Sequence, residues 1–208
     1  MQKLLVFQDT PNIEAGFGNF CRRLNIPQRE FDHGLMLDYL SEGRNLMAAH
    51  CYVAVDPRNP AGKDQQINHL WSSGWMVHEK IGETGVDGHW RVFDVEMALD
   101  IANLSRSICP DIVTICSGDE TLLPVVIHLR RNGIRVEVAA FECSTSKNMA
   151  RKSSGFISLD IAVDQWFGSR PAVDNIGAAA GSPETELVEP ELLQTADAPF
   201  RNTIEIVS

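Results

Sequence analysis

The stretch DIVTICSGDETLLPVVIHLRRNGIRVEV, residues 111–138, decides the fold class of this chain. It opens with a short apolar run, DIVTIC, which is typical of a buried strand. Ser117 or Asp119 can then cap a helix, and Gly133 supplies the stop at its C-terminal end. The next apolar run, IRVEVAAF at 134–141, completes a strand–helix–strand unit. Such a unit predicts a right-handed crossover between parallel strands.

The same alternation of strands and helices extends to both sides of this unit. On the N-terminal side we expect strands at 3–8, within 45–56 and at 75–79, with helices at 12–25, 30–42, 64–73 and 92–108. On the C-terminal side we expect a short helix at 145–152 and a last strand within GFISLDIAV, residues 155–163. The pattern predicts an α/β fold: a three-layer sandwich, doubly wound, with a mostly parallel central sheet covered on both faces.

The composition divides the chain into a domain and a tail. Of the 208 residues, 44% are hydrophobic, which is enough for a full core. After about Gly168 the sequence becomes rich in Pro, Ala, Gly and acidic residues, which favours an extended tail. We therefore predict a domain at 1–168 and a tail at 169–208, in which RNTIEIVS alternates enough to add an edge strand.

Charge and hydropathy limit the classes of function. The formal net charge of −10 opposes long-range attraction of nucleic acid and suits a cation-binding protein. A bound divalent cation and a local basic rim can still reverse the field inside a cleft. The N-terminal run is too short for a signal peptide, and no stretch of 18 apolar residues follows. We therefore expect a soluble, cytoplasmic protein with no membrane partner.

The cysteines and histidines give little evidence of a site. Five cysteines lie scattered without a CxxC pair, so neither a disulfide framework nor a zinc site is indicated, and we expect buried thiols. The six histidines are dispersed and receive no role.

Two aspartates follow strands, where a doubly wound sheet binds ligands, and a third is either a helix N-terminal residue or a member of the same cleft. Asp9 directly follows the first predicted strand, and Asp119 lies three residues after DIVTIC. Asp94 lies near the start of the middle helix, between apolar neighbours. Each alone is readily explained as a cap, turn or surface residue. Together they are expected at the carboxyl edge of the sheet, where close carboxylates repel unless a cation lies between them. Oxygen ligands select Mg²⁺ or Mn²⁺.

The segments around Asp9 and Asp94 resemble those of a known family. VFQDTPN (6–12) is similar to the opening strand of NYN domains of the LabA type, a branch of the PIN-like ribonucleases. In that family the strand ends in Asp-x-x-Asn, which Asp9 and Asn12 match. RVFDVEMALDIA (91–102) resembles the family's helix start, a basic residue followed by x-x-Asp-Val, with Asp94 as the acid.

The later segments carry the same resemblance. Residues 111–138 are similar to the family's Ser-Gly-Asp stretch, with Asp119 as its aspartate, and 144–160 resemble its closing helix and strand. The likeness thus covers about residues 3–160 and implies a PIN-like fold.

The resemblance also implies a chemistry, namely metal-assisted hydrolysis of an RNA phosphodiester. Asp9, Asp94 and Asp119 would hold one or two Mg²⁺ or Mn²⁺ ions, and Asn12 would orient the water or a phosphate oxygen. RNA is then the expected substrate and a divalent metal the expected cofactor. Oligomerisation with further copies of the chain is left open.

Two departures from the family pattern keep alternatives open. Thr121 stands where the family commonly has a second acid, and Pro11 stands where an acid is frequent. A catalytically inactive NYN module that binds RNA or a protein partner is therefore the second hypothesis. A receiver-like phosphoryl-transfer domain is the third hypothesis. It would require a pair of acids after the first strand and a lysine after a late strand, whereas this chain has only Asp9 and no such lysine.

Overall fold

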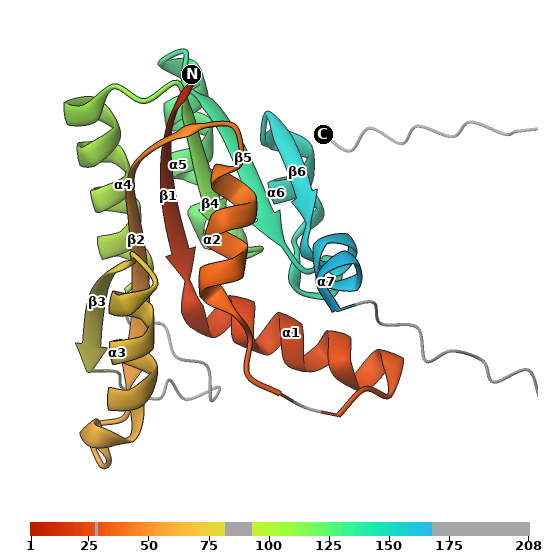
Figure 1. Cartoon of the computed structure of the whole chain (residues 1–208). Coiled ribbons are helices and arrows are strands. Elements are labelled where there is room, and N and C mark those ends of the chain that lie inside the picture. Colours follow the sequence, from red (N-terminus) through yellow and green to blue (C-terminus); the bar gives the residue numbers. More distant parts are fainter. Residues whose placement is uncertain (28, 82–92, 168–208) are drawn as a thin grey trace, which may run out of the picture. The chain divides into compact units, whose positions relative to one another are not determined.

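A computed structural model of the chain describes residues 1–27, 29–81 and 93–167. Six strands form one sheet in the order β3-β2-β1-β4-β5-β6, and all neighbouring strands are parallel (Figure 1). The strands are β1 Lys3–Asp9, β2 Asn45–Val55, β3 Met76–Ile81, β4 Ile112–Cys116, β5 Arg135–Ala140 and β6 Gly155–Ser158. The predicted α/β architecture is therefore confirmed, and the sheet is parallel throughout the described residues.

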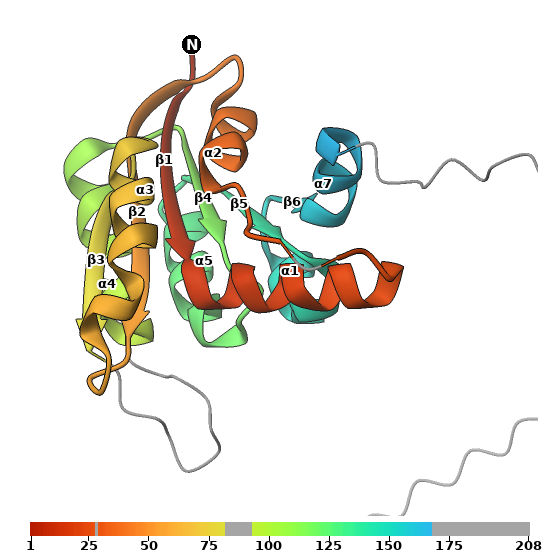
Figure 2. The ribbon, with the colours of Figure 1, turned by 60° about the horizontal axis from the view of Figure 1, so that its bottom comes forward.

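Helices cover both faces of this sheet (Figures 1 and 2). One face packs against α1, α2, α3 and α7, and the other against α4, α5 and α6. The helices are α1 Thr10–Leu24, α2 His33–Ser41, α3 Asp64–Ser72, α4 Asp94–Ile108, α5 Leu123–Arg131, α6 Lys147–Lys152 and α7 Leu159–Phe167. Three short 3₁₀ helices, η1 Pro60–Lys63, η2 Glu120–Leu122 and η3 Glu142–Ser144, lie in the connections. These layers form the predicted three-layer sandwich.

Strand β1 shows how the sequence builds the two-sided core. Leu4 and Val6 face the cluster under α1 and α2, whereas Leu5 and Phe7 face the cluster under α4 and α5. All four side chains are fully buried. Successive side chains of a strand point to opposite faces, so a strand covered on both sides must be apolar at every position. Strand β1 is the central element that both helical layers share.

The last strand lies within GFISLDIAV, as predicted, but it takes up only part of that segment. It ends at Ser158, and LDIAV begins helix α7, which the sequence did not predict. Leu159, Ala162 and Val163 are fully buried at helical spacing, i, i+3 and i+4. Burial of this stripe against the α1–α2 face decides the helix.

The cysteines also differ in part from the expectation. Cys21, Cys51 and Cys116 are buried free thiols, as predicted. Cys109 and Cys143 are exposed, so the expectation that all five are buried was wrong. Cys109 ends helix α4 in the left-handed conformation, with φ of 50°, and a helix end of this kind lies at the surface.

The predicted tail at 169–208 and the edge strand within it lie outside the described residues. In the part of the chain that is described, no helix is both long and apolar enough to cross a membrane.

Candidate metal centre

The sheet grows in two directions from β1, which lies between β2 and β4. In a doubly wound sheet with this strand order, ligands bind beyond the carboxyl ends of the strands, where the order reverses. Asp9 is the last residue of β1, and Gln8 pairs in register with Cys116, the last residue of β4. The segments that carry Asp9 and Asp119 therefore leave neighbouring strands at the same edge.

Asp9 is held by hydrogen bonds from both segments. It caps helix α1, where its Oδ1 accepts from the backbone N–H of Asn12 at 3.1 Å. Its Oδ2 accepts from the hydroxyl of Ser117 at 3.0 Å. Only 7% of its surface is exposed, so this carboxylate is fixed in one position.

The surroundings of Asp9 disfavour its negative charge. Burial raises the pKa of Asp9 from 3.8 to about 6, although the hydrogen bonds from Asn12 and Ser117 oppose this rise. The negative charges of Asp94 and Asp119 raise the pKa further. The three aspartates predicted to form the site are therefore coupled electrostatically.

A second pair of hydrogen bonds completes the link between the two strand ends. The side-chain Oδ1 of Asn12 accepts from the backbone N–H of Gly118 at 3.0 Å, and the Ser117 hydroxyl accepts from the N–H of Asp119 at 3.2 Å. We call Asp9, Asn12, Ser117 and Gly118 the β1–β4 clasp. It sets the position of the turn that carries Asp119.

Asp119 forms the cap of η2 and has its acidic neighbour turned away. Its Oδ1 accepts from the backbone N–H of Thr121 at 2.8 Å. Glu120 instead accepts from Ser146 and Asn148, both at 2.7 Å, and these bonds lower the pKa of Glu120. Glu120 therefore does not replace the acid that the family commonly has at position 121.

Asp94 is the first residue of α4 and is half-buried. Phe93 before it is buried in the core under α4, whereas Val95 after it is 75% exposed. Of the two apolar neighbours of Asp94, one is therefore buried in the core and the other is exposed to solvent. Arg91, the basic residue of the helix start, lies outside the described residues.

The carboxylates are not arranged as a ready-made metal site. Within the described residues, no three His, Cys, Asp or Glu side chains are close enough to hold one ion between them. Hydrogen bonds connect Asp9 to the segment of Asp119, and the charge of Asp94 acts on Asp9. The donor set is chemically suited to Mg²⁺ or Mn²⁺, because all its atoms are carboxylate oxygens. A bound cation would also relieve the repulsion at Asp9.

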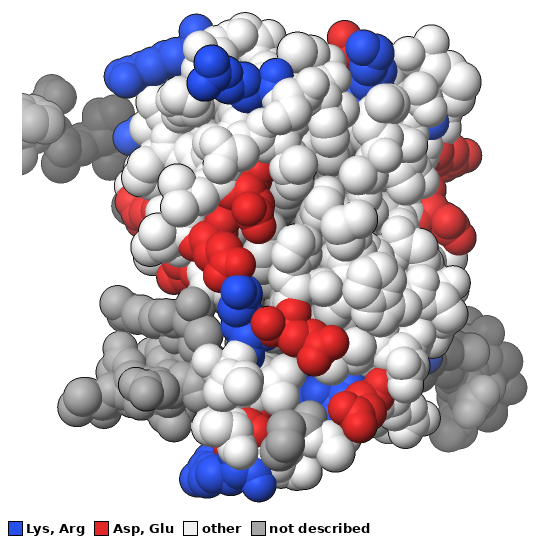
Figure 3. Space-filling model, turned by 90° about the vertical axis from the view of Figure 1, so that its left-hand side faces the viewer, with Lys and Arg blue, Asp and Glu red and all other residues white. Residues whose placement is uncertain are grey.

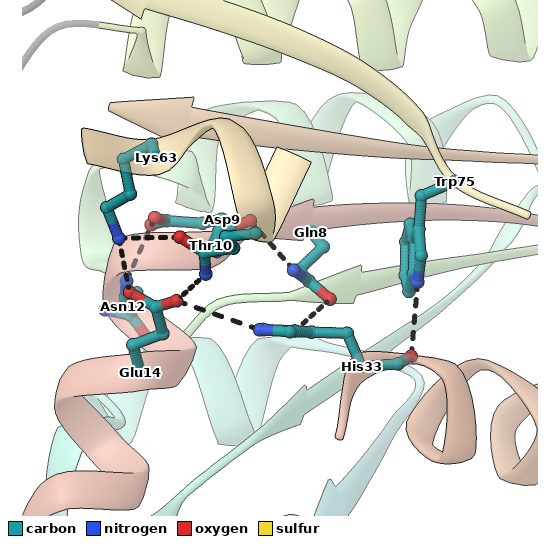
Figure 4. Close-up of polar contacts among 9 residues, drawn as sticks. Gln8, Asp9, Thr10, Asn12, Glu14, His33, Lys63 and Trp75 are labelled. Atoms are coloured by element: carbon teal, nitrogen blue, oxygen red, sulfur yellow. Dashed lines mark hydrogen bonds and ion pairs between the residues drawn. The ribbon is translucent and has the colours of Figure 1, made fainter. Parts of the chain in front are cut away.

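A second polar group lies beside the clasp, on the α1–α3 side (Figure 4). His33 is buried between Gln8, whose Oε1 is 3.2 Å from its Nδ1, and Glu14, whose Oε1 is 3.8 Å from its Nε2. Lys63 lies 3.4 Å from the other oxygen of Glu14, and Gln66 also donates to Glu14. Burial raises the pKa of Glu14, but these partners outweigh it and the pKa is lowered. Glu14 is therefore ionised.

Sequence reasoning missed this group as well as a pair of histidines. Nδ1 of His50 and Nε2 of His78 are 3.0 Å apart, beneath helix α4, and Tyr52 donates to Asp100 close by at 2.7 Å. Burial and the neighbouring His78 lower the pKa of His50. His50 and His78 are 28 residues apart, and no spacing rule connects them. Only the pairing of β2 with β3 brings them together.

Comparisons with known proteins identify the family of this chain and one similar fold. Residues 3–160 match the family model of the NYN domain, and no curated protein matches the chain. The chain is similar to the solved structure of VPA0982 from Vibrio parahaemolyticus RIMD 2210633, a protein of unknown function. That match has a TM-score of 0.61 and 21% identity, and covers 76% of this chain and 93% of that one.

A second solved structure, an isochorismatase-like hydrolase from Alkaliphilus metalliredigens, aligns with 80% of this chain and 100% of its own. Its TM-score of 0.35 and identity of 11% are too low to support an argument. The match to VPA0982 supports the fold alone. The family model spans all six strands up to β6, together with Asp9, Asp94 and Asp119. The chain therefore belongs to the NYN domain family and has the PIN-like, nuclease-type fold.

Proposed function

We propose that this NYN domain is a metal-dependent ribonuclease that hydrolyses RNA phosphodiester bonds. Asp9, Asp94 and Asp119 are the metal ligands in this proposal, and Asn12 is the positioning group. The observation that carries it is the buried carboxylate of Asp9, fixed by the β1–β4 clasp and opposed by the charges of Asp94 and Asp119. Carboxylates that repel one another at a ligand-binding edge favour a cation between them.

Each residue has a distinct part in this mechanism. A bound Mg²⁺ or Mn²⁺ ion would offset the charge of the scissile phosphate and lower the pKa of an attacking water. Asp9 supplies a ligand whose position is already fixed by two hydrogen bonds. Asp119 is carried to the same edge by the clasp, and Asp94 approaches from the start of α4. Asn12 uses its oxygen to hold Gly118, which leaves its amide N–H₂ to orient a water or a phosphate oxygen.

Cleavage of mixed RNA and DNA in the presence of Mn²⁺, with Asp119→Asn as the variant, tests the proposal. The change keeps an oxygen that can accept from Thr121 but removes the charge, so the fold should survive. We expect cleavage of RNA to fall by at least about 100-fold, because loss of a residue that only supports a metal ligand already costs about 10–100-fold. Glu120→Gln is the matched control, since its carboxylate is bound to Ser146 and Asn148, and it should keep its activity.

Two outcomes of this assay would contradict the proposal. Hydrolysis that survives EDTA would exclude a metal mechanism. Hydrolysis that survives Asp119→Asn would place the active site elsewhere.

Thr121 favours a second candidate function, an inactive NYN module that binds RNA or a protein partner. The family commonly has an acid at this position, and here the residue contributes its backbone N–H to the cap of Asp119. If the domain is a nuclease with a reduced site, Thr121→Asp should strengthen metal binding. Wild-type protein that binds RNA or a partner but shows no Mg²⁺- or Mn²⁺-dependent hydrolysis would favour the second function.

A further inference from the structure

A cavity of about 590 Å³ opens next to the candidate metal centre, on the α1–α3 side. It is lined by Glu14 and Gly18 of α1, His33 at the start of α2, and Lys63 and Gln66 from the η1–α3 segment. Phe17 also lines it and provides an apolar wall. Its volume lies in the range of small-molecule sites, roughly 300–1,000 Å³, and it combines an apolar wall with a few polar groups.

The cavity lies close to Asp9 along helix α1. Glu14 follows Asp9 by five residues and Gly18 by nine, which places them about 7.5 and 13.5 Å along the helix axis. Because α1 starts at the carboxyl edge of the sheet, the cavity and the aspartates share that edge. A nucleotide next to the scissile phosphate could therefore place its base in this cavity.

Glu14 and Lys63 offer a defined set of hydrogen-bonding groups to such a base. The Glu14 carboxylate accepts from Gln66 at Oε1 and from Lys63 at Oε2, the latter at 3.4 Å. Nε2 of His33 also lies 3.8 Å from Oε1, which is beyond hydrogen-bond distance. A carboxylate has about four acceptor positions, so one hydrogen-bonding position remains on each oxygen. Lys63 uses its ammonium on Glu14 and Gln66 and has a third hydrogen to donate. Both side chains are about one-third exposed, Glu14 at 33% and Lys63 at 37%.

We propose that this cavity binds an unpaired guanine of the RNA, next to the cleaved phosphate. The N1–H and N2–H groups of guanine would donate to the two oxygens of Glu14, and its O6 would accept from Lys63. The inference rests on the proposed ribonuclease function. Adenine places an acceptor nitrogen opposite the carboxylate, and uracil flanks its one N–H with two carbonyl oxygens. Cytosine offers only its amino group.

A purely structural role for these residues would have a different signature. Glu14 and Lys63 also connect α1 to η1, and that bridge alone would affect stability without any preference among bases. A measurement of base preference therefore separates the two roles.

The test is fluorescence anisotropy with labelled oligouridylates that carry one central guanine, inosine, adenine or cytosine, in EDTA so that no metal-dependent cleavage occurs. Inosine lacks only the N2 amino group of guanine. We expect the guanine oligomer to bind at least about tenfold more tightly than the inosine oligomer, because one hydrogen bond to a charged acceptor is lost. Equal affinity for guanine and inosine, or tighter binding of cytosine, would overturn the assignment.

Two variants connect the preference to the cavity. Glu14→Gln replaces one acceptor oxygen with a donor and should abolish the preference for guanine. Gly18→Leu should obstruct the cavity, and its Cβ has room because a Cβ at Gly18 meets no atom within 4 Å. The controls are Gly18→Ala, which is smaller, and Glu42→Gln, which is exposed at the end of α2. Thermal midpoints of all four confirm folding, and a preference that persists in both test variants would refute the proposal.

Failure of this inference differs from failure of the proposed function. Metal-dependent cleavage of RNA with no base preference would refute the guanine site and leave the nuclease in place. Guanine-selective binding that Glu14→Gln abolishes, without cleavage under any metal condition, would support the site and refute the nuclease.

Discussion

At the scale of single residues, Asp9 serves the fold and the candidate site at once. Its carboxylate caps α1 and accepts from Ser117, so it is structurally fixed. The same burial raises its pKa to about 6. In the metal-free protein a charged Asp9 therefore lowers the free energy of unfolding, and a bound cation would remove this effect.

The first residue-scale prediction concerns pH. An acid whose pKa is higher in the folded than in the unfolded chain binds more protons when folded, so the free energy of unfolding falls as pH rises between 3.8 and about 6. This loss amounts to roughly 3 kcal/mol at pH 7. Asp9→Asn should raise the free energy of unfolding at pH 7 and flatten this slope. Urea unfolding in EDTA from pH 4 to 8 measures both, with Glu42→Gln as control. A variant less stable than wild type at pH 7 would contradict the prediction.

The second residue-scale prediction concerns the metal. At a Mn²⁺ concentration of about 100 times Kd, binding adds about 2.7 kcal/mol to the free energy of unfolding. For a domain of this size that is roughly 5–10 °C in thermal midpoint. Wild type should show this rise at pH 7.5, as should Asp56→Asn, whose partly exposed carboxylate pairs only with Arg58 in the described residues. Asp9→Asn should show little. An equal rise in all three proteins would mean that the ion binds elsewhere.

At the scale of elements, the turn after β4 is held by close backbone packing. A Cβ added at Gly118 would lie 2.3 Å from the backbone oxygen of Ser144, in η3. The backbone oxygen of Gly118 also accepts from the N–H of Ser146 at 2.9 Å. The Ser-Gly-Asp segment therefore needs glycine because η3 lies against it.

Substitution of this glycine gives a prediction with an internal control. Gly118→Ala should destabilise the domain by about 1–3 kcal/mol or more, because the collision is with backbone that cannot rotate away. It should also lower activity, since the clasp that positions Asp119 would shift. Gly18→Ala adds the same methyl group to open space within α1 and should stabilise by up to about 1 kcal/mol. Chemical unfolding of the two variants measures both effects, and a neutral Gly118→Ala would show that η3 can move.

At the scale of the whole molecule, basic residues do not concentrate at the candidate site. Figure 3 views the side of β3 and α4, and it shows basic side chains along the top, where the strands begin, as well as further down toward the opposite end. Helices α4 and α5 end at that edge with Arg106, Arg130 and Arg131. Cations at helix C-termini are favoured by the helix dipole, so the fold explains this placement without a ligand. RNA reaching the opposite edge would depend on the cation and on basic groups there, such as Lys63.

Truncation after residue 168 gives a prediction at this scale. All six strands and both hydrophobic clusters lie within residues 3–167. Removal of residues 169–208 should therefore leave the thermal midpoint within a few degrees, because an acidic, Pro- and Ala-rich segment buries little apolar area. Differential scanning calorimetry of the two forms measures this. Loss of soluble protein on truncation would show that the segment is part of the fold or of an oligomer.

The sequence by itself determined the alternation of strands and helices and the places where they end. These are local properties: the apolar run of β1, the cap at Asp119 and the stop at Gly133 each depend on a few neighbouring residues. Because parallel strands share one carboxyl edge, acids that follow strands could also be predicted to lie at that edge. The resemblance to the family adds Asp94 to the predicted site. The local pattern alone does not decide whether Asp94 is a helix N-terminal residue or a metal ligand.

Only the tertiary structure decided which side chains meet across that edge. The bond from Ser117 to Asp9 spans 108 residues, and the pair of Lys63 and Glu14 spans 49. Helix α7, which the sequence did not predict, likewise depends on an apolar stripe that is buried against elements far away in the chain. Such contacts depend on strand order, register and crossover path, and no short window of sequence contains them. The cavity beside Asp9 belongs to this second class, since three separate segments have to converge to form it.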